Sequence, residues 1–457
     1  MISQKHLIYI FLNSCFATLS GTLSWFGEGY TFFIYCFSFV LLLTQAIHQL
    51  NLRSIFFWFV LCYLTLFYLS PISEFLFPGE VLSGTPRSIE IYHILNIASI
   101  HIFCAVYFLF YRKKDESVLI LVNSSRFDLA LYIMGALTIL SALWMLKSVG
   151  GFSAINMTRV ELKYVQGGKG LALLLSYFSS VFYVLLGVFL ARKKFNPIYV
   201  LMVLVLFLLL EYIYFISLRN RTMIMTHLLA IPVGFYIFKR MQFTRGAIEY
   251  RNKTPSKVKV TPLLLALGLL SILGVFVRFA RGVYVEGSGA LGMSLKDMLI
   301  VSVKSGDMGY ANMVIRIFDY AYIHDFFLNG QSYYRLLMAF VPSFIYDKKI
   351  PTTDSLIGQM LTGLDVMTIP PGVFGDAYLN YGFLGLIVFI CYGVIFSLFD
   401  RSKKVLSSYL FFAISFTFIY HFVRGSFVNV IISLTIVYLG VYVATKIIKP
   451  RYLYTNR

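Results

Sequence analysis

The sequence predicts an all-α, polytopic integral membrane protein with about 12 transmembrane helices and one large periplasmic loop. Of the 457 residues, 59% are hydrophobic and only 13% are charged, whereas soluble proteins carry about 25% charged residues. The charges gather between apolar runs long enough to cross a hydrocarbon core about 30 Å thick. Because a backbone in lipid must satisfy its own hydrogen bonds, and a membrane β-barrel would show shorter alternating segments, we expect these runs to be helices.

The apolar runs set the positions of the predicted spans. They are residues 7–25, 29–47, 54–72, 91–111, 127–147, 171–191, 197–217, 222–238, 261–278, 380–399, 406–422 and 426–446. The first run lacks a small-residue cleavage site and is followed at once by another, so we expect no cleavable signal peptide.

The net charge of +19 is explained by its placement. In a twelve-span arrangement the basic clusters fall on one side, which also holds both termini. These clusters are residues 112–114, 192–194, 239–259, 401–404 and 446–457. By the positive-inside rule that side is cytoplasmic. The charge therefore reflects topology and contact with anionic lipids, and we exclude nucleic acid as a partner.

We expect three parts along the chain. Residues 1–278 hold the first nine transmembrane helices, residues 279–379 form the large periplasmic loop, and residues 380–457 hold the last three helices and a basic tail. The loop is rich in Tyr, Phe, Leu and Ile. Its segments SLKDMLIVSV and ANMVIRIFDYAYI have helical apolar spacing, so we expect short amphipathic helices that lie on the membrane surface.

Arginines recur at the non-cytoplasmic ends of the predicted spans, against the positive-inside bias. Guanidinium groups hold phosphate through paired hydrogen bonds, so the set would suit a lipid-linked pyrophosphate. The alternative is that each arginine reaches a lipid phosphate or pairs with a loop carboxylate. The candidates are Arg219, Arg221, Arg278, Arg281 and Arg424, and the loop of residues 148–170 adds Arg159.

Three residues are candidates for general acid–base chemistry. Glu211 lies inside a span, where an unpaired carboxylate is costly, so an ion pair with a neighbouring arginine is the alternative to catalysis. Asp376 precedes a span in the segment IPPGVFGDAYLNYGFLGL; it is either a helix N-cap or a base, with Tyr378 beside it. His421 lies one turn before Arg424 and is either a base or a buried structural histidine.

The sequence gives no sign of a metal site or a cofactor. The loop aspartates are spread apart, and the five cysteines all fall within spans without a CxxC pair. Arginines alone could stabilise a leaving pyrophosphate.

Residues 306–386 resemble the core of the Wzy-type O-antigen polymerases, the oligosaccharide repeat-unit polymerases of bacterial envelopes. The resemblance is carried by FLNGQSYYRLLMAFVPSFIYDKKIPTTDS and by PPGVFGDAYLNYGFLG. Asp376 stands where the family usually has Glu, and Lys349-Ile350-Pro351 stands where it has Lys-Pro. The twelve-span arrangement and the late outer loop also fit the family.

The resemblance implies a polyprenyl-pyrophosphate-dependent glycosyltransferase. A glycan on undecaprenyl pyrophosphate would be the donor, and one repeat unit on the same carrier would be the acceptor. Arg219, Arg221, Arg278, Arg281 and Arg424 would bind pyrophosphate, and Asp376 or His421 would be the base. The second lipid-linked glycan would contact Arg159, Arg335 and Tyr378.

Two other functions stay open. An O-antigen ligase would use the same donor, and a flippase or transporter of lipid-linked oligosaccharides would belong to a different class. The resemblance also implies a location in the bacterial inner membrane. Expected partners are undecaprenyl-pyrophosphate-linked oligosaccharides and the bilayer, and a chain-length regulator protein is a further candidate.

Overall fold

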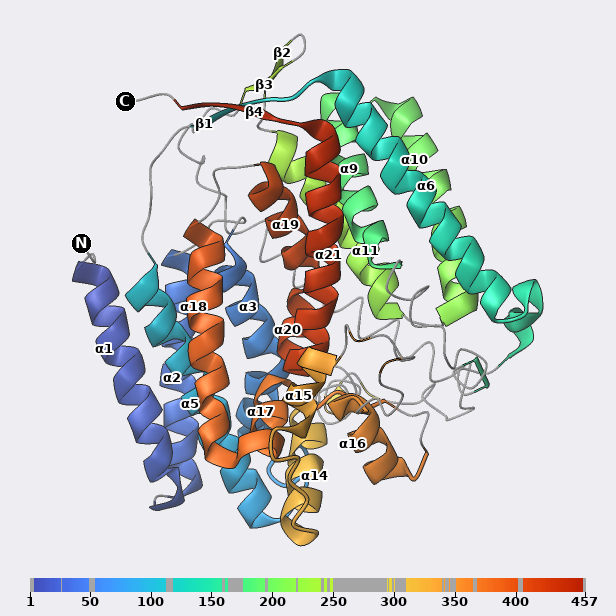
Figure 1. The fold of residues 1–457 in the computed structure, drawn as a ribbon. Coiled ribbons are helices and arrows are strands. Elements are labelled where there is room, and N and C mark those ends of the chain that lie inside the picture. The colour runs from blue at the N-terminus through green and yellow to red at the C-terminus, as the bar shows by residue number, and fades with distance from the viewer. Residues whose placement is uncertain are drawn as a thin grey trace. The chain divides into compact units, whose positions relative to one another are not determined.

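A computed structural model of the chain is built mainly from long helices (Figure 1). It describes residues 4–25, 27–48, 54–111, 118–157, 161–162, 176–193, 196–218, 221–239, 242–244, 247–249, 294, 296–297, 300, 310–338, 341, 345, 351–364, 368–401 and 406–454. The chain divides into two compact units. Unit 1 comprises residues 1–111, 254–331 and 371–397, and unit 2 comprises residues 112–253, 332–370 and 398–457.

Within the described residues, eight helices are long and apolar enough to cross a membrane. The prediction of an all-α polytopic membrane protein is confirmed at that level. Three further predicted spans contain shorter apolar helical stretches among the described residues, at 178–192, 226–235 and 406–415. The predicted span 261–278 lies outside the described residues.

Unit 1 is assembled from the first helices of the chain and two later segments. Its elements are α1 (Gln4–Leu19), η1 (Ser20–Trp25), α2 (Glu28–His48), α3 (Ile55–Tyr63), η2 (Leu64–Tyr68), α4 (Leu69–Leu76), α5 (Pro86–Phe110), α14 (Tyr310–Ile323), α17 (Val373–Tyr381), η5 (Gly382–Leu386) and most of α18 (Ile387–Arg401). The predicted loop helix over residues 311–323 is confirmed by α14, whose apolar face packs against α5 and α17.

A proline shapes the third span of unit 1. Helices α3, η2 and α4 form one continuous span, and η2 is a π-helical turn. Pro71 has no N–H, so it cannot bond the Phe67 carbonyl one turn earlier. That carbonyl instead accepts hydrogen bonds from Tyr92 Oη at 2.8 Å and from Asn96 Nδ2 at 3.0 Å. Side chains of α5 therefore repair the break and join the two spans.

A buried polar chain joins four spans of unit 1. His101 Nδ1 lies 2.7 Å from Asn13 Oδ1, and His101 Nε2 lies 2.6 Å from Ser38 Oγ. Ser38 Oγ in turn lies 2.7 Å from Tyr68 Oη. Because lone polar groups in lipid are costly, this chain favours one arrangement of α1, α2, η2 and α5.

Unit 2 contains the remaining helices and a small sheet. Its elements are β1 (Val118–Leu121), α6 (Ser124–Ser148), η3 (Gly151–Asn156), α9 (Phe178–Arg192), α10 (Pro197–Leu218), α11 (Arg221–Lys239), β2 (Gln242–Thr244), β3 (Ala247–Glu249), α15 (Gln331–Met338), α16 (Thr353–Thr362), α19 (Leu406–Thr417), α20 (Ile419–Arg424), α21 (Phe427–Ile448) and β4 (Arg451–Tyr454).

The sheet was not predicted from the sequence, which assigned its residues to loops and a tail. The strand order is β2-β3-β1-β4, with antiparallel pairing and Ile120 opposite Tyr452. Strands of three or four residues separated by basic segments give too little alternation to be recognised. The sheet gathers the start of α6 and the ends of α11 and α21 at one end of unit 2 (Figure 1).

Other contacts place more helix ends beside the sheet. Arg192, at the end of α9, pairs with Asp128 of α6 at 2.6 Å. Leu406, at the start of α19, donates its N–H to Tyr452 Oη at 3.3 Å. Helices α6, α9, α11, α19 and α21 therefore share this end, which we call the sheet end, and among the described residues its cations include Arg192, Lys446 and Arg451.

Helices α9 and α11 approach closely through two glycines. A Cβ on Gly187 would lie 2.1 Å from the Ile231 carbonyl oxygen, and a Cβ on Gly234 would lie 2.3 Å from the Val184 carbonyl oxygen. Small residues at such crossings let backbones meet, which is how membrane helices gain packing contact.

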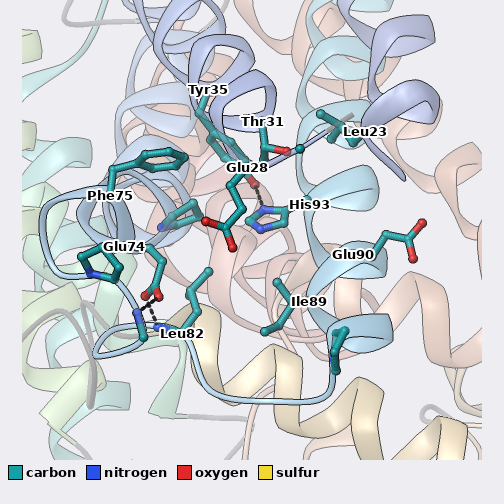
Figure 2. A pocket seen from close by; sticks show the side chains of 15 residues that line it. Leu23, Glu28, Thr31, Tyr35, Glu74, Phe75, Leu82, Ile89, Glu90 and His93 are labelled. Atoms are coloured by element: carbon teal, nitrogen blue, oxygen red, sulfur yellow. Dashed lines mark hydrogen bonds between the residues drawn. The ribbon is translucent and has the colours of Figure 1, made fainter. Parts of the chain in front are cut away.

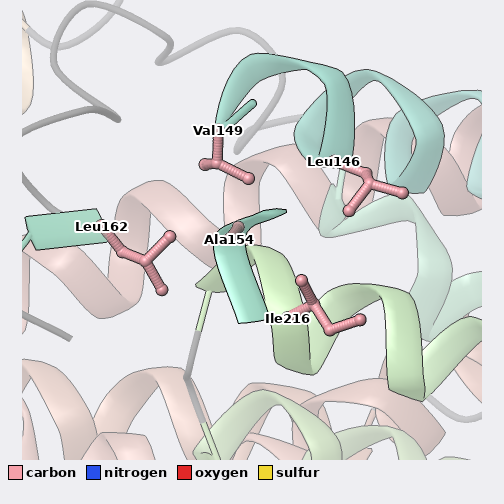
Figure 3. Packing of buried hydrophobic residues seen from close by; sticks show 5 residues of the cluster. All are labelled: Leu146, Val149, Ala154, Leu162 and Ile216. Carbon is pink, nitrogen blue, oxygen red and sulfur yellow. The ribbon is translucent and has the colours of Figure 1, made fainter. Parts of the chain in front are cut away.

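The opposite end of unit 2 has an apolar cluster around η3. Leu146 and Val149 at the end of α6, Ala154 in η3, Leu162, and Ile216 near the end of α10 are all buried together (Figure 3). The turn into η3 uses Gly150 and Gly151, both with positive φ. The predicted glycine-rich connection after residue 148 thus begins as a packed turn.

Candidate functional site

Arg335, Asn429 and Asp354 form a polar network at the N-terminal end of α21. Arg335 Nη1 on α15 donates to Asn429 Oδ1 at 3.0 Å, and Asn429 Nδ2 on α21 donates to Asp354 Oδ2 on α16 at 3.1 Å. The amide of Asn429 therefore bridges a guanidinium and a carboxyl group. Tyr333 also packs its ring on Phe427, with centroids 5.5 Å apart, which fixes α15 against α21.

Local sequence positions Asp354 in this network. Thr352 caps α16 by accepting a hydrogen bond from the Ser355 N–H at 2.9 Å, so Asp354 falls in the first turn. The Asp354 carbonyl accepts the Ile369 N–H at 2.8 Å, which ties the segment after α16 back to its start. Such capping is the expected behaviour of a Thr-Thr-Asp-Ser sequence.

Burial controls the electrostatics of this network. Desolvation raises the pKa of Asp354, although Ser426, Asn429 and Arg335 act in the opposite direction. Desolvation lowers the pKa of Arg335, and the Asp354 charge partly offsets it. A guanidinium stays protonated in proteins, so Arg335 brings a cation to this end of α21.

Arg424 and His421 lie on α20, immediately before α21. Arg424 Nη1 donates to Tyr420 Oη, and the guanidinium lies 5.4 Å from the centre of the Tyr420 ring. Arg424 lies two residues before Ser426. Ser426 is the N-cap of α21 and a neighbour of Asp354. Two cations thus lie at a helix N-terminus, which is itself partly positive, and this arrangement favours an anion such as phosphate.

Glu211 has a histidine and a tyrosine as partners among the described residues. Glu211 Oε1 lies 2.7 Å from His227 Nδ1 and accepts the Tyr183 hydroxyl at 2.7 Å. The neighbouring arginine side chains of the alternative prediction, Arg219 and Arg221, lie outside the described part of the chain. His227 Nε2 lies 2.6 Å from Ser179 Oγ. These contacts form because α9 and α11, joined at their glycines, bring these side chains to the face of α10 that carries Glu211.

The Ser179–His227–Glu211 order matches that of a catalytic triad. All three side chains are buried, however, and the Ser179 hydroxyl donates to the Ser176 carbonyl oxygen. A serine so engaged is poorly placed as a nucleophile. The cluster chiefly stabilises the packing of α9, α10 and α11.

Asp376 and Tyr378 belong to unit 1 and lie in α17. The N-cap of α17 is Gly372, so the interpretation of Asp376 as an N-cap is wrong: the helix starts at Val373, directly after the two prolines and Gly372. Asp376 is fully buried and lies 3.4 Å from Asn380 Nδ2. Tyr378 is also buried, with its ring 4.7 Å from that of Phe318.

The glycines around Asp376 have packing roles. Gly372 has φ of +73°, and a Cβ there would meet the Phe67 ring at 3.0 Å. A Cβ on Gly385 would lie 2.2 Å from the Ala377 carbonyl oxygen, which allows η5 to fold tightly back on α17. This segment therefore positions the one carboxyl group of α17 within a close-packed core.

The two segments of the family resemblance meet within unit 1. The Leu328 N–H donates to the Leu379 carbonyl oxygen at 2.8 Å, and Phe327 contacts Tyr378 with ring centroids 5.7 Å apart. Asn329 and Gly330 both have positive φ, and a Cβ on Gly330 would meet Tyr381 Oη at 2.8 Å. The Phe-Leu-Asn-Gly turn is thus shaped to pack on α17.

Unit 1 also holds a cavity of about 490 Å³ between the ends of α2, α4 and α5 (Figure 2). Glu28, Glu90 and His93 line it together with apolar side chains. His93 Nδ1 bonds Tyr35 Oη at 3.0 Å. The third carboxylate, Glu74, is occupied by the backbone N–H groups of Gly79, Val81 and Leu82, so its role is to shape the loop.

The remaining predicted arginines lie wholly or partly outside the described part of the chain. Arg159, Arg219, Arg278 and Arg281 lie outside the described residues. Arg221 begins α11, and its side chain is outside the described part. Among the described residues no three His, Cys, Asp or Glu side chains could hold a metal ion.

Sequence reasoning missed four residues of these clusters: Asp354, Asn429, Ser179 and His227. His227 had a usable signal, because the rule that marks ionisable residues inside spans applies to histidine as well as to Glu211. Asp354 and Asn429 had no such signal in the sequence, because each looks like an ordinary polar residue near a helix start.

Comparisons with known proteins give no relative. No protein-family model, no curated protein and no solved structure matches this chain.

Proposed function

We propose that this protein is a membrane glycosyltransferase that polymerises undecaprenyl-pyrophosphate-linked oligosaccharide repeat units at the periplasmic face of the bacterial inner membrane. The product would be O-antigen or a similar surface polysaccharide. The proposal depends on the resemblance of residues 306–386 to the Wzy-type polymerases, and the structure adds physical support to it.

The observation that carries the proposal is the pair of cations at the N-terminal end of α21. Helix α21 has 22 residues and is therefore about 33 Å long, close to the thickness of a hydrocarbon core. Its other end carries the basic sheet end of unit 2. If the sheet end is cytoplasmic, as the positive-inside rule favours, Arg335 and Arg424 lie at the periplasmic interface.

The chemistry requires a cationic site at that interface. An acceptor hydroxyl attacks the anomeric carbon of the donor glycan, the bond from that carbon to the pyrophosphate oxygen breaks, and undecaprenyl pyrophosphate leaves. A base takes the hydroxyl proton. Arg335 and Arg424 would stabilise the negative charge that develops on the leaving pyrophosphate.

Two candidates for the base follow from the sequence, Asp376 and His421. His421 lies one turn from Arg424 on α20, so it accompanies the cations directly. Asp376 lies in the segment that carries the family resemblance. We assign Glu211 to the support of α9–α11, because its partners Tyr183 and His227 already engage it.

The test is deletion of the gene in its host, followed by gel separation of the surface polysaccharide. We expect the ladder to collapse to core plus one repeat unit. Loss of all surface glycan with lipid-linked polymer outside would point to a ligase, and accumulation of single units inside would point to a flippase. An unchanged ladder in a host without a second polymerase would refute the proposal.

A further inference from the structure

A groove between α6 and α21 at the sheet end of unit 2 combines cations with apolar walls. It has a volume of about 500 Å³. Arg126 from α6, and Lys446 and Lys449 from the end of α21, line its polar part. Leu129 and Ile133 from α6 and Tyr442 from α21 line the rest. No carboxylate is among its lining residues in the described part of the chain.

Helix dipoles account for only part of this set of cations. Lys446 lies in the last turn of α21, where a cation is favourable. Arg126, however, lies in the first turn of α6, the partly positive end of that helix, where a cation is unfavourable. Arg126 is exposed and, within the described residues, has no carboxylate partner, so its charge is available to an anion from outside the chain.

The backbone at Lys449 is a second, independent sign. Lys449 is the C-cap of α21 and has φ of +47° and ψ of +62°. Glycine is the usual residue in this left-handed conformation, because it avoids the Cβ clash. Lysine occupies this position at a cost in backbone strain, and its side chain lines the groove as a third cation beside Arg126 and Lys446.

We infer that this groove binds one anionic phospholipid through its phosphodiester group. The cations would hold the phosphate oxygens, and the acyl chains would follow the apolar walls, where Leu129 and Tyr442 are each about half exposed. A free phosphate ion would satisfy the cations but would leave the apolar walls without a partner. The site is distinct from the proposed pyrophosphate site, which lies at the other end of α21.

The experiment is native mass spectrometry of the full-length protein in detergent, titrated with phosphatidylglycerol or with phosphatidylcholine of identical acyl chains. We expect one phosphatidylglycerol molecule to be retained in preference to phosphatidylcholine. Arg126→Gln, Lys446→Gln and Lys449→Gly should each weaken its binding about fivefold, since a lysine or arginine near an anionic membrane surface contributes about 1 kcal/mol.

Two controls make the outcome decisive. Lys193→Gln removes one charge at the same end of unit 2 but outside the groove, so it should leave lipid retention unchanged. Lys449→Gly relieves backbone strain, so weaker binding in that variant cannot come from misfolding. Equal retention of the two lipids, or variants that bind like the wild type, would overturn the inference. Displacement of phosphatidylglycerol by millimolar inorganic phosphate would also overturn it in favour of a free-anion site.

Discussion

Asn429 links the cation and the carboxyl at the proposed pyrophosphate site. Its amide oxygen accepts from Arg335 and its amide nitrogen donates to Asp354, so the two charged groups are ordered without a direct ion pair. A direct pair would occupy the guanidinium with a carboxylate. The bridge uses one of the five guanidinium N–H donors, and the cation keeps its charge for a ligand.

Arg335→Ala should therefore lower polymerisation by about 10²- to 10³-fold, as expected for loss of a group that stabilises transition-state charge. Arg424→Ala should have a similar effect. The measurement is the length distribution of surface glycan in the deletion host that carries each variant, with protein levels checked by immunoblot. Arg451→Ala, an exposed arginine on β4, is the matched control. Normal chain lengths in both site variants would remove these arginines from pyrophosphate binding.

The buried Glu211–His227 pair makes a different prediction. Breaking one member of a buried charged pair typically costs about 3 kcal/mol or more, whereas replacing both by apolar residues is often neutral or stabilising. Glu211→Ala should thus lower the unfolding temperature in detergent, and the double variant Glu211→Leu with His227→Phe should largely restore it.

The glycan ladder of the same double variant separates structure from catalysis. If the pair only supports packing, restored stability should bring restored chain extension. A stable double variant that makes no polymer would instead place Glu211 or His227 in the reaction.

At the scale of elements, glycines decide how closely helices pack. Gly187 and Gly234 allow α9 and α11 to meet at backbone distance, whereas a Cβ on Gly29, in the first turn of α2, would have no atom within 4 Å. Gly187→Ala should destabilise the protein by about 1–3 kcal/mol, the usual cost of overpacking. Gly29→Ala should be neutral or slightly stabilising, since alanine is the better helix former. Thermal unfolding in detergent measures both, and equal shifts would contradict the close crossing.

The elements also show what the sequence could and could not reveal. Apolar length alone located the long spans, because each must match the bilayer. The predicted span 406–422 is divided, because α19 ends at Thr417 and a separate α20 begins at Ile419. The start of the predicted span 171–191 lies outside the described residues. The four-stranded sheet escaped detection since its strands are too short for a periodic pattern.

Site residues were harder to predict than spans for a similar reason. Arg424 was visible as a cation at a span end where few are expected. Arg335 was named only as a contact of the second lipid-linked glycan, not as a member of the pyrophosphate set. Asp354 and Asn429 become part of the Arg335 network only because α15, α16 and α21 converge. Nothing in the sequence predicts that convergence. Of the glycines in the segment 369–386, Gly372 takes a positive φ of +73° just before α17, whereas Gly375 lies within that helix.

For the whole molecule, the decisive question is which end of unit 2 faces the cytoplasm. The sheet end holds one end of each of five helices and the cations Arg192, Lys446 and Arg451, and the cations of α15 and α20 lie about one bilayer thickness away along α21. The proposed reaction requires lipid-linked substrates at the α15–α16 end. Orientation therefore links the topology to the proposed function.

Cysteine labelling tests that orientation directly. In a background with the five native cysteines replaced, Gln359→Cys on α16 and Arg451→Cys on β4 each offer one exposed thiol. An impermeant maleimide should label Gln359→Cys in spheroplasts, whereas Arg451→Cys should react only after lysis, because the positive-inside rule keeps the basic sheet in the cytoplasm. The reverse pattern would place Arg335 and Arg424 at the cytoplasmic face. That result would exclude polymerisation at the periplasmic face, and it would move the lipid groove between α6 and α21 to the outer leaflet.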